Sequence, residues 1–113
     1  MAKQVIVTGS SGIAAALIRA LDARGDAIYI VGGIDSESET LQKDCKNIKG
    51  YSSVDLREED QTISAFQSAN QTLGNVTDVV GIVGGSGRKF GDGRVDEISL
   101  DAWNRTLALN LST

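Results

Sequence analysis

Short runs rich in β-branched residues alternate along the chain with longer segments in which apolar residues recur every three or four positions. The short runs are almost continuously apolar, which is typical of strands that are covered on both faces of a sheet. Glycines follow three of these runs, at Gly9, Gly32 and Gly84. The predicted strands are residues 4–8, 27–31, 49–54 and 77–83.

The longer segments have the helical repeat, and each follows a predicted strand. Gly25 ends the first helix, a serine or aspartate cap opens the second, and a glycine-rich loop at 84–96 precedes the fourth. The predicted helices are residues 12–24, 36–46, 56–73 and 98–112. Their predicted inward faces are Ile13, Leu17, Ala20 and Leu21 in the first, Ile63, Phe66, Ala69 and Leu73 in the third, and Leu100, Trp103 (as a core anchor), Leu107 and Leu111 in the fourth.

This alternation predicts an α/β fold in which helices cover both faces of a parallel sheet. The 113 residues fit one domain, residues 1–113.

A net charge of −4 and the lack of a lysine or arginine stripe argue against a nucleic-acid partner. No apolar run approaches the roughly 20 residues of a membrane span. Because residues 1–4 lead straight into the first strand without a signal-peptide core, we expect a cytoplasmic protein.

The chain has a single cysteine and no histidine. Cys45 therefore cannot form an internal disulfide, which suits a reducing compartment, and no imidazole is present to activate it. We interpret it as a structural thiol on a helix surface or half-buried. Because no cysteine and histidine cluster can form, we expect no metal site.

The strongest local signal joins the first strand to the first helix. Glycines at this point allow a tight turn and a close approach of the backbone to a diphosphate, which the N–H groups of the helix start can bind. Small residues in the first turn, here Ala14 and Ala15, let the helix pack closely on the strand. The alternative is a plain strand–helix turn with glycines for geometry alone. The candidate cofactor-binding residues in this turn are Gly9, Ser10, Ser11, Gly12 and Ile13.

This turn resembles the Thr-Gly-x-x-x-Gly-x-Gly turn of the short-chain dehydrogenase/reductase family, with matches at Thr8, Gly9, Gly12 and Ile13. The loop is one residue shorter than in the family, and Ala14 replaces the last glycine. The resemblance implies a Rossmann-type parallel sheet of about four strands that forms a dinucleotide-binding domain, with NAD or NADP as cofactor.

Further matches follow in the family's order along the whole chain. Asp55 corresponds to the aspartate that accepts the adenine amino group, and Leu56 to the residue whose N–H meets the adenine ring. Gly84 is the one match to the family's Asn-Asn-Ala-Gly strand. Asn110 corresponds to the asparagine that bends this helix and holds a water linked to the catalytic lysine. The alternatives are a helix cap for Asp55 and a tolerated polar residue near a helix end for Asn110.

The choice between NAD and NADP stays open in the sequence. NAD-binding folds place an acid about 20 residues after the glycines, at the end of the second strand. Glycines 32 and 33 stand there, Asp35 comes two or three residues late, and no arginine for the 2′-phosphate of NADP follows the strand.

The resembled family completes its active site with a serine and a Tyr-x-x-x-Lys pattern. Four residues after Tyr29 and Tyr51 stand Gly33 and Asp55, so neither tyrosine begins that pattern. We therefore expect the NAD(P)-binding part of such an oxidoreductase, truncated relative to the family fold and inactive as this chain. The alternative is a non-enzymatic nucleotide-sensing or structural module. We also expect a homo-oligomer. Its chains would associate through the fourth strand, which is left at a sheet edge, or through the last helix.

Overall fold

The computed structural model describes residues 2–82, 84, 93–94 and 96–110. The chain divides into two compact units, Met1–Ile82 and Val83–Thr113. The described part of the first unit holds a four-stranded parallel sheet in the order β3-β2-β1-β4. Its strands are β1 (Gln4–Thr8), β2 (Ala27–Val31), β3 (Ile48–Ser52) and β4 (Asp78–Gly81).

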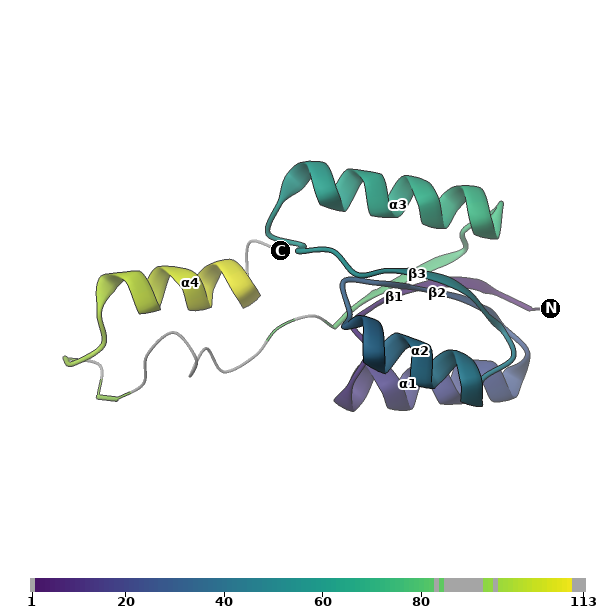
Figure 1. The fold of residues 1–113 in the computed structure, drawn as a ribbon, viewed down its shortest axis with the longest axis horizontal. Helices are drawn as coiled ribbons and strands as arrows, with labels where there is room; N and C mark the ends of the chain where they lie inside the picture. Colours follow the sequence, from purple (N-terminus) through teal and green to yellow (C-terminus); the bar gives the residue numbers. More distant parts are fainter. Residues whose placement is uncertain (1, 83, 85–92, 95, 111–113) are drawn as a thin grey trace. The chain divides into compact units, whose positions relative to one another are not determined.

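The helices of the first unit are α1 (Gly12–Arg24), α2 (Asp35–Asp44) and α3 (Glu59–Leu73). In Figure 1, α1 and α2 lie on one face of the sheet and α3 lies on the other. The second unit contains α4 (Leu100–Asn110). The predicted parallel α/β sheet with helices on both faces is therefore confirmed.

Alternate residues of the central strands β1 and β2 pack into two hydrophobic cores, one on each face of the sheet. Val7 and Ile30 lie in the core under α1 and α2, whereas Ile6 and Val31 lie in the core under α3. Because both faces are buried, these strands carry apolar residues without alternation, and their predicted bounds of 4–8 and 27–31 match the structure. The register aligns Thr8 with Val31 and with Gly81, so the strands end at one edge of the sheet.

The outer strands differ from their predicted bounds for local reasons. β3 begins one residue earlier, at Ile48, whose buried side chain pairs with Ile28. It ends at Ser52, whose carbonyl accepts the N–H of Gly32 at 2.8 Å. β4 stops at Gly81 because the next N–H, from Ile82, is donated to the Thr8 hydroxyl at 2.8 Å. Val83, the predicted last residue, lies outside the described residues.

Three helix starts were predicted incorrectly. The expected serine or aspartate cap of α2 is absent: Ile34 precedes the helix without a side-chain cap, and Asp35 lies in the first turn, where the helix dipole favours it. α3 starts at Glu59, not at residue 56, because Asp55 accepts the N–H of Glu58 in a turn. α4 starts after Ser99, whose hydroxyl accepts the Ala102 N–H at 3.0 Å.

The predicted inward face of α1 is rotated by one position. Its buried residues are Ala14, Ile18 and Leu21, while Ile13 is 76% exposed. The buried positions follow the helical spacing of four and three residues, so the stripe that contacts the sheet begins at Ala14. Of the predicted face only Leu21 is buried, and Leu17 is half-buried.

A similar shift occurs in α3, which buries Ala65, Ala69 and Leu73. Ile63, predicted to face inward, is exposed, and Phe66 is only partly buried. Alanines at the contact positions let the α3 backbone approach the sheet, where a larger side chain would hold it away. Ala69 and Leu73 are buried as predicted. The helical period was therefore right, and only part of the predicted face of α3 was wrong.

The predicted inward face of α4 is also wrong. Ala102 is buried, whereas Leu100, Trp103 and Leu107 are exposed, so Trp103 is not a core anchor. Leu111 lies outside the described residues. The described part of this unit has one helix, and a single helix has no second layer that could cover an apolar face.

Cys45 follows α2 directly and is more buried than predicted. Burial raises the pKa of its thiol, and the nearby carboxylate of Asp22 raises the pKa further. A raised thiol pKa lowers the thiolate fraction at neutral pH, which fits the predicted structural role. No helix of the described residues has the length and apolar character to cross a membrane.

The rotation of α1 can be tested with a matched pair of substitutions. Ile18→Ala removes three carbons from a fully buried side chain and should lower the free energy of unfolding by about 3 kcal/mol. Ile13→Ala makes the same change at an exposed position and should cost less than about 0.5 kcal/mol. Urea denaturation followed by circular dichroism measures both values. Equal losses would contradict the described face of α1.

Candidate functional site

The turn between β1 and α1 adopts the backbone conformation that its glycines permit. Gly9 has φ of 113° and Gly12 has φ of 55°, in the region that L-residues with a side chain rarely enter. Ser11 precedes α1 in an extended conformation and makes no side-chain cap hydrogen bond. Within the described part of the chain, no acceptor is found for the N–H groups of Gly12 and Ile13.

Ser10 points into the fold and joins the turn to the next loop. Its side chain is 5% exposed. Its hydroxyl accepts the N–H of Ile34 at 2.9 Å and donates to the Glu37 carboxylate at 2.8 Å. The Ser10 hydroxyl therefore fixes the glycine turn to the start of α2, and both of its partners come from the segment that follows β2.

The glycine pair after β2 has other groups packed directly against it. A Cβ on Gly33 would lie 2.5 Å from the Cβ and Oγ of Ser10. A Cβ on Gly32, which has φ of +78°, would lie 2.7 Å from a methyl carbon of Leu56. The loops after β1 and β3 thus close onto the loop after β2 from its two sides. Any side chain on this pair would separate them.

Asp55 lies in the turn after β3 and is paired with Arg57. Its carboxylate accepts the Arg57 backbone N–H at 2.9 Å and the guanidinium at 3.0 and 2.9 Å. These hydrogen bonds raise the pKa of Arg57. The residue before α3 is Glu58, which makes no side-chain cap, so Asp55 does not cap that helix directly.

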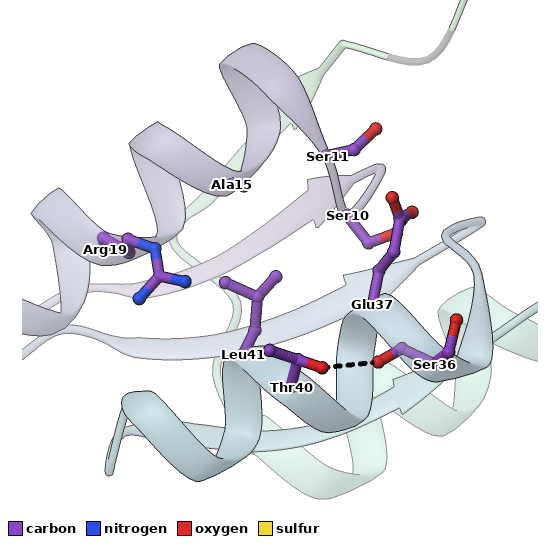
Figure 2. Close-up of a pocket in the computed structure, with 8 residues that line it drawn as sticks. All are labelled: Ser10, Ser11, Ala15, Arg19, Ser36, Glu37, Thr40 and Leu41. Atoms are coloured by element: carbon purple, nitrogen blue, oxygen red, sulfur yellow. Dashed lines mark hydrogen bonds between the residues drawn. The ribbon is translucent and has the colours of Figure 1, made fainter.

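A groove of about 360 Å³ runs between α1 and α2, beside the glycine turn. Figure 2 shows Ser10, Ser11 and Glu37 at one end of it and Arg19 at the other. Arg19 is paired with Asp44 at 3.1 Å. The α2 side is completed by Ser36, Thr40 and Leu41, and the α1 side by Ala15.

Gly84 and Asn110 lie together in the second unit. A Cβ on Gly84 would be 2.5 Å from the Asn110 side-chain oxygen. The Asn110 amide donates to the Thr106 carbonyl one turn back in α4, at 3.0 Å. Two residues selected independently from the sequence therefore share one contact, which requires glycine at 84. Of the described residues, no acidic or cysteine group of three or more is placed to hold a metal ion.

The family model described as short chain dehydrogenase matches residues 3–113, nearly the whole sequence. The chain belongs to this family. Similar solved structures include short-chain dehydrogenases/reductases from Vibrio parahaemolyticus, with 28% identity and a TM-score of 0.81, and from Serratia marcescens, with 25% identity and a TM-score of 0.82. A structure of ElxO with NADP bound has the same fold at 20% identity and a TM-score of 0.82.

These alignments cover 96–99% of this chain but only 45–50% of the solved chains, so the chain spans about half the length of its relatives. It corresponds to the N-terminal part of the short-chain dehydrogenase fold. No curated protein matches it.

Sequence reasoning missed Glu37, which the structure places against the glycine turn between β1 and α1. The contact spans 27 residues, and Glu37 lies in a helix whose composition is mainly polar, so no periodic pattern distinguished it from its neighbours. The one hint in the sequence is that Gly32 and Gly33 stand where NAD-binding folds place an acid, so the end of β2 itself offers none.

The packing of the glycine pair gives a direct prediction. Gly33→Ala places a methyl group against Ser10 and should lower the free energy of unfolding by about 1–3 kcal/mol, because the two loops are forced apart. Gly81→Ala, in a strand and with no atom near the added carbon, should leave stability unchanged or raise it slightly. Thermal unfolding of both variants measures the difference. A Gly33→Ala protein as stable as Gly81→Ala would show that the loops are not in contact.

Proposed function

We propose that the turn between β1 and α1 binds the diphosphate of NAD or NADP. The observation that carries this proposal is the pair of N–H groups at Gly12 and Ile13, which have no acceptor within the described residues and open a helix of 13 residues. Such groups, together with the positive end of the helix dipole, favour an anion. The helix has no acidic residue in its first turn, so none of its own side chains neutralises this end.

The turn is also shaped for a close approach. Gly9 and Gly12 hold positive φ angles, and a Cβ on Gly12 would meet no atom within 4 Å, so the space beside the helix start is open. ElxO, which has this fold, has NADP bound in its structure. We extend dinucleotide binding to this chain on its family membership and on the geometry of its turn.

The remaining candidate residues are assigned by the family resemblance. We propose that Asp55 accepts the adenine amino group while it keeps its pairing with Arg57, and that the Leu56 N–H meets the adenine ring. Gly84 lines the cofactor site in this proposal, and Asn110 takes part in catalysis by positioning a water.

Binding without turnover is the outcome we expect for these 113 residues. Oxidoreduction in this family needs a general acid at the substrate carbonyl. The Tyr29 hydroxyl lies 2.6 Å from the Ser52 hydroxyl, and the Tyr51 hydroxyl donates to Glu39 at 3.3 Å. Neither tyrosine has a lysine four residues later. Neither tyrosine is therefore expected to act as the general acid.

Calorimetric titration with NAD, NADH, NADP and NADPH tests the proposal. Wild-type protein should bind at least one of them with micromolar affinity. Gly12→Ala puts a methyl group at the start of α1 and should weaken that binding at least about tenfold, the equivalent of 1.4 kcal/mol. The matched control is Gly25→Ala at the other end of α1, which also has positive φ and open space.

Both glycine substitutions force alanine into a left-handed conformation, at a cost of about 1–2 kcal/mol each. Gly25→Ala should therefore lose similar stability and keep the wild-type dissociation constant. Equal weakening by both variants would trace the effect to folding and contradict the site. If the folded wild-type chain bound none of the four dinucleotides, the chain would be a structural module in which the glycines serve only the geometry of the turn.

We further propose that a second copy of the chain pairs along β4. This strand lies at the edge of the described sheet, and Val79 on it is 55% exposed. An apolar strand edge pairs with another chain unless it is covered. Light scattering of the purified chain should give at least twice the monomer mass. A monodisperse monomer of 11.9 kDa would reject this proposal.

The expected cytoplasmic location also stays a proposal. The single cysteine is free and buried, so the described fold uses no disulfide and suits a reducing compartment.

A further inference from the structure

The end of β2 cannot carry the acid that dinucleotide-binding folds use to bind the adenosine ribose. In these folds an aspartate or glutamate at this position accepts a hydrogen bond from the ribose 2′-hydroxyl. Here a Cβ on Gly33 would lie 2.5 Å from the Cβ of Ser10, and a Cβ on Gly32 would displace the Leu56 side chain and would require a φ of +78° that side chains rarely adopt. The place of the usual acid is therefore closed by packing.

A carboxylate from another element reaches the neighbouring glycine turn. Glu37 extends from the first turn of α2 toward the glycine turn, and its Oε1 accepts the Ser10 hydroxyl at 2.8 Å (Figure 2). Ser10 is in turn the residue that packs on Gly33. Glu37 and Ser11 therefore line the same end of the groove. Asp35, the candidate from the sequence, is exposed and does not line the groove.

We propose that Glu37 is the ribose-binding carboxylate of this site and that it makes the site select NAD over NADP. This inference rests on the proposed dinucleotide binding and adds the identity of the cofactor. The inference is based on the position of Glu37 beside Ser10 and on the packing of Ser10 against Gly33.

The hydrogen-bond donors and acceptors at this end of the groove favour an unphosphorylated ribose. The second carboxylate oxygen of Glu37 has no hydrogen bond within the described residues, so it is open to a 2′-hydroxyl donor. A 2′-phosphate offers mainly acceptors and carries negative charge, which the carboxylate repels. Ser10 cannot compensate, because its one proton is donated to Glu37.

The cation that lines the groove does not change this balance. Arg19 lies eight residues after Ser11, which places its backbone about 12 Å further along the axis of α1. Its guanidinium is paired with Asp44 at 3.1 Å, at the end of the groove away from Glu37. A 2′-phosphate beside Ser10 would therefore contact Glu37 and not Arg19.

The test compares the dissociation constants of the full chain for NAD and NADP by calorimetric titration. Wild-type protein should bind NAD at least about tenfold more tightly than NADP. Glu37→Gln removes the charge, keeps the shape and leaves an acceptor for Ser10, so the ratio should fall to within about threefold. The readout is the ratio of two ligands on one folded variant, which a purely structural loss would leave unchanged.

Glu39→Gln is the matched control. This substitution makes the same chemical change two residues away, and Glu39 lies outside the groove, beside Tyr51. It should keep the wild-type ratio. Tighter binding of NADP by the wild type, or a ratio unchanged by Glu37→Gln, would overturn the role of Glu37 while leaving dinucleotide binding intact. No binding of either ligand would overturn both the inference and the function on which it rests.

Discussion

Close packing around two adjacent glycines is the constraint on which the candidate site depends. Gly32 and Gly33 let the loop after β1 and the loop after β3 approach the loop after β2, with Ser10 on one side and Leu56 on the other. The parallel register brings the ends of β1, β2 and β4 to one level, so these loops start from a common edge of the sheet. The glycine turn is held against its neighbours by this contact and by the Ser10 hydroxyl. Its geometry is therefore fixed by the sheet below it and does not depend on the turn alone.

The chemical character of the site follows from what α1 lacks. Its first turn has neither a side-chain cap nor an acid, which leaves helix-opening amides for another partner. α2 has the opposite character, since Asp35 and Glu37 both lie in its first turn. The groove between the two helices therefore has a carboxylate on its α2 side, and the helix-opening amides belong to the turn that adjoins it. That polarity matches a ligand with an anionic centre and a neutral hydroxyl-bearing flank.

Much of the fold could be predicted from the sequence because both faces of the central strands are buried. β2 is a continuous apolar run, and β1 has three consecutive β-branched apolar residues between Gln4 and Thr8. The rotation of α1 could not be predicted, since Ile13 and Ile18 are chemically equal and only their contact with the sheet separates them. The positions of Gly9 and Gly12 were predicted from their spacing, whereas Glu37 was missed because its contact with Ser10 exists only in three dimensions.

The Ser10 hydroxyl couples the glycine turn to α2 through one proton. In evolutionary terms, this coupling makes the residue at position 37 hard to exchange alone. An arginine or lysine there has no acceptor atom, so the proton of the buried Ser10 hydroxyl would lose the partner that Glu37 provides. A lineage that changed the charge of this helix would therefore need a second substitution at Ser10, so the two positions should vary together among descendants of this chain.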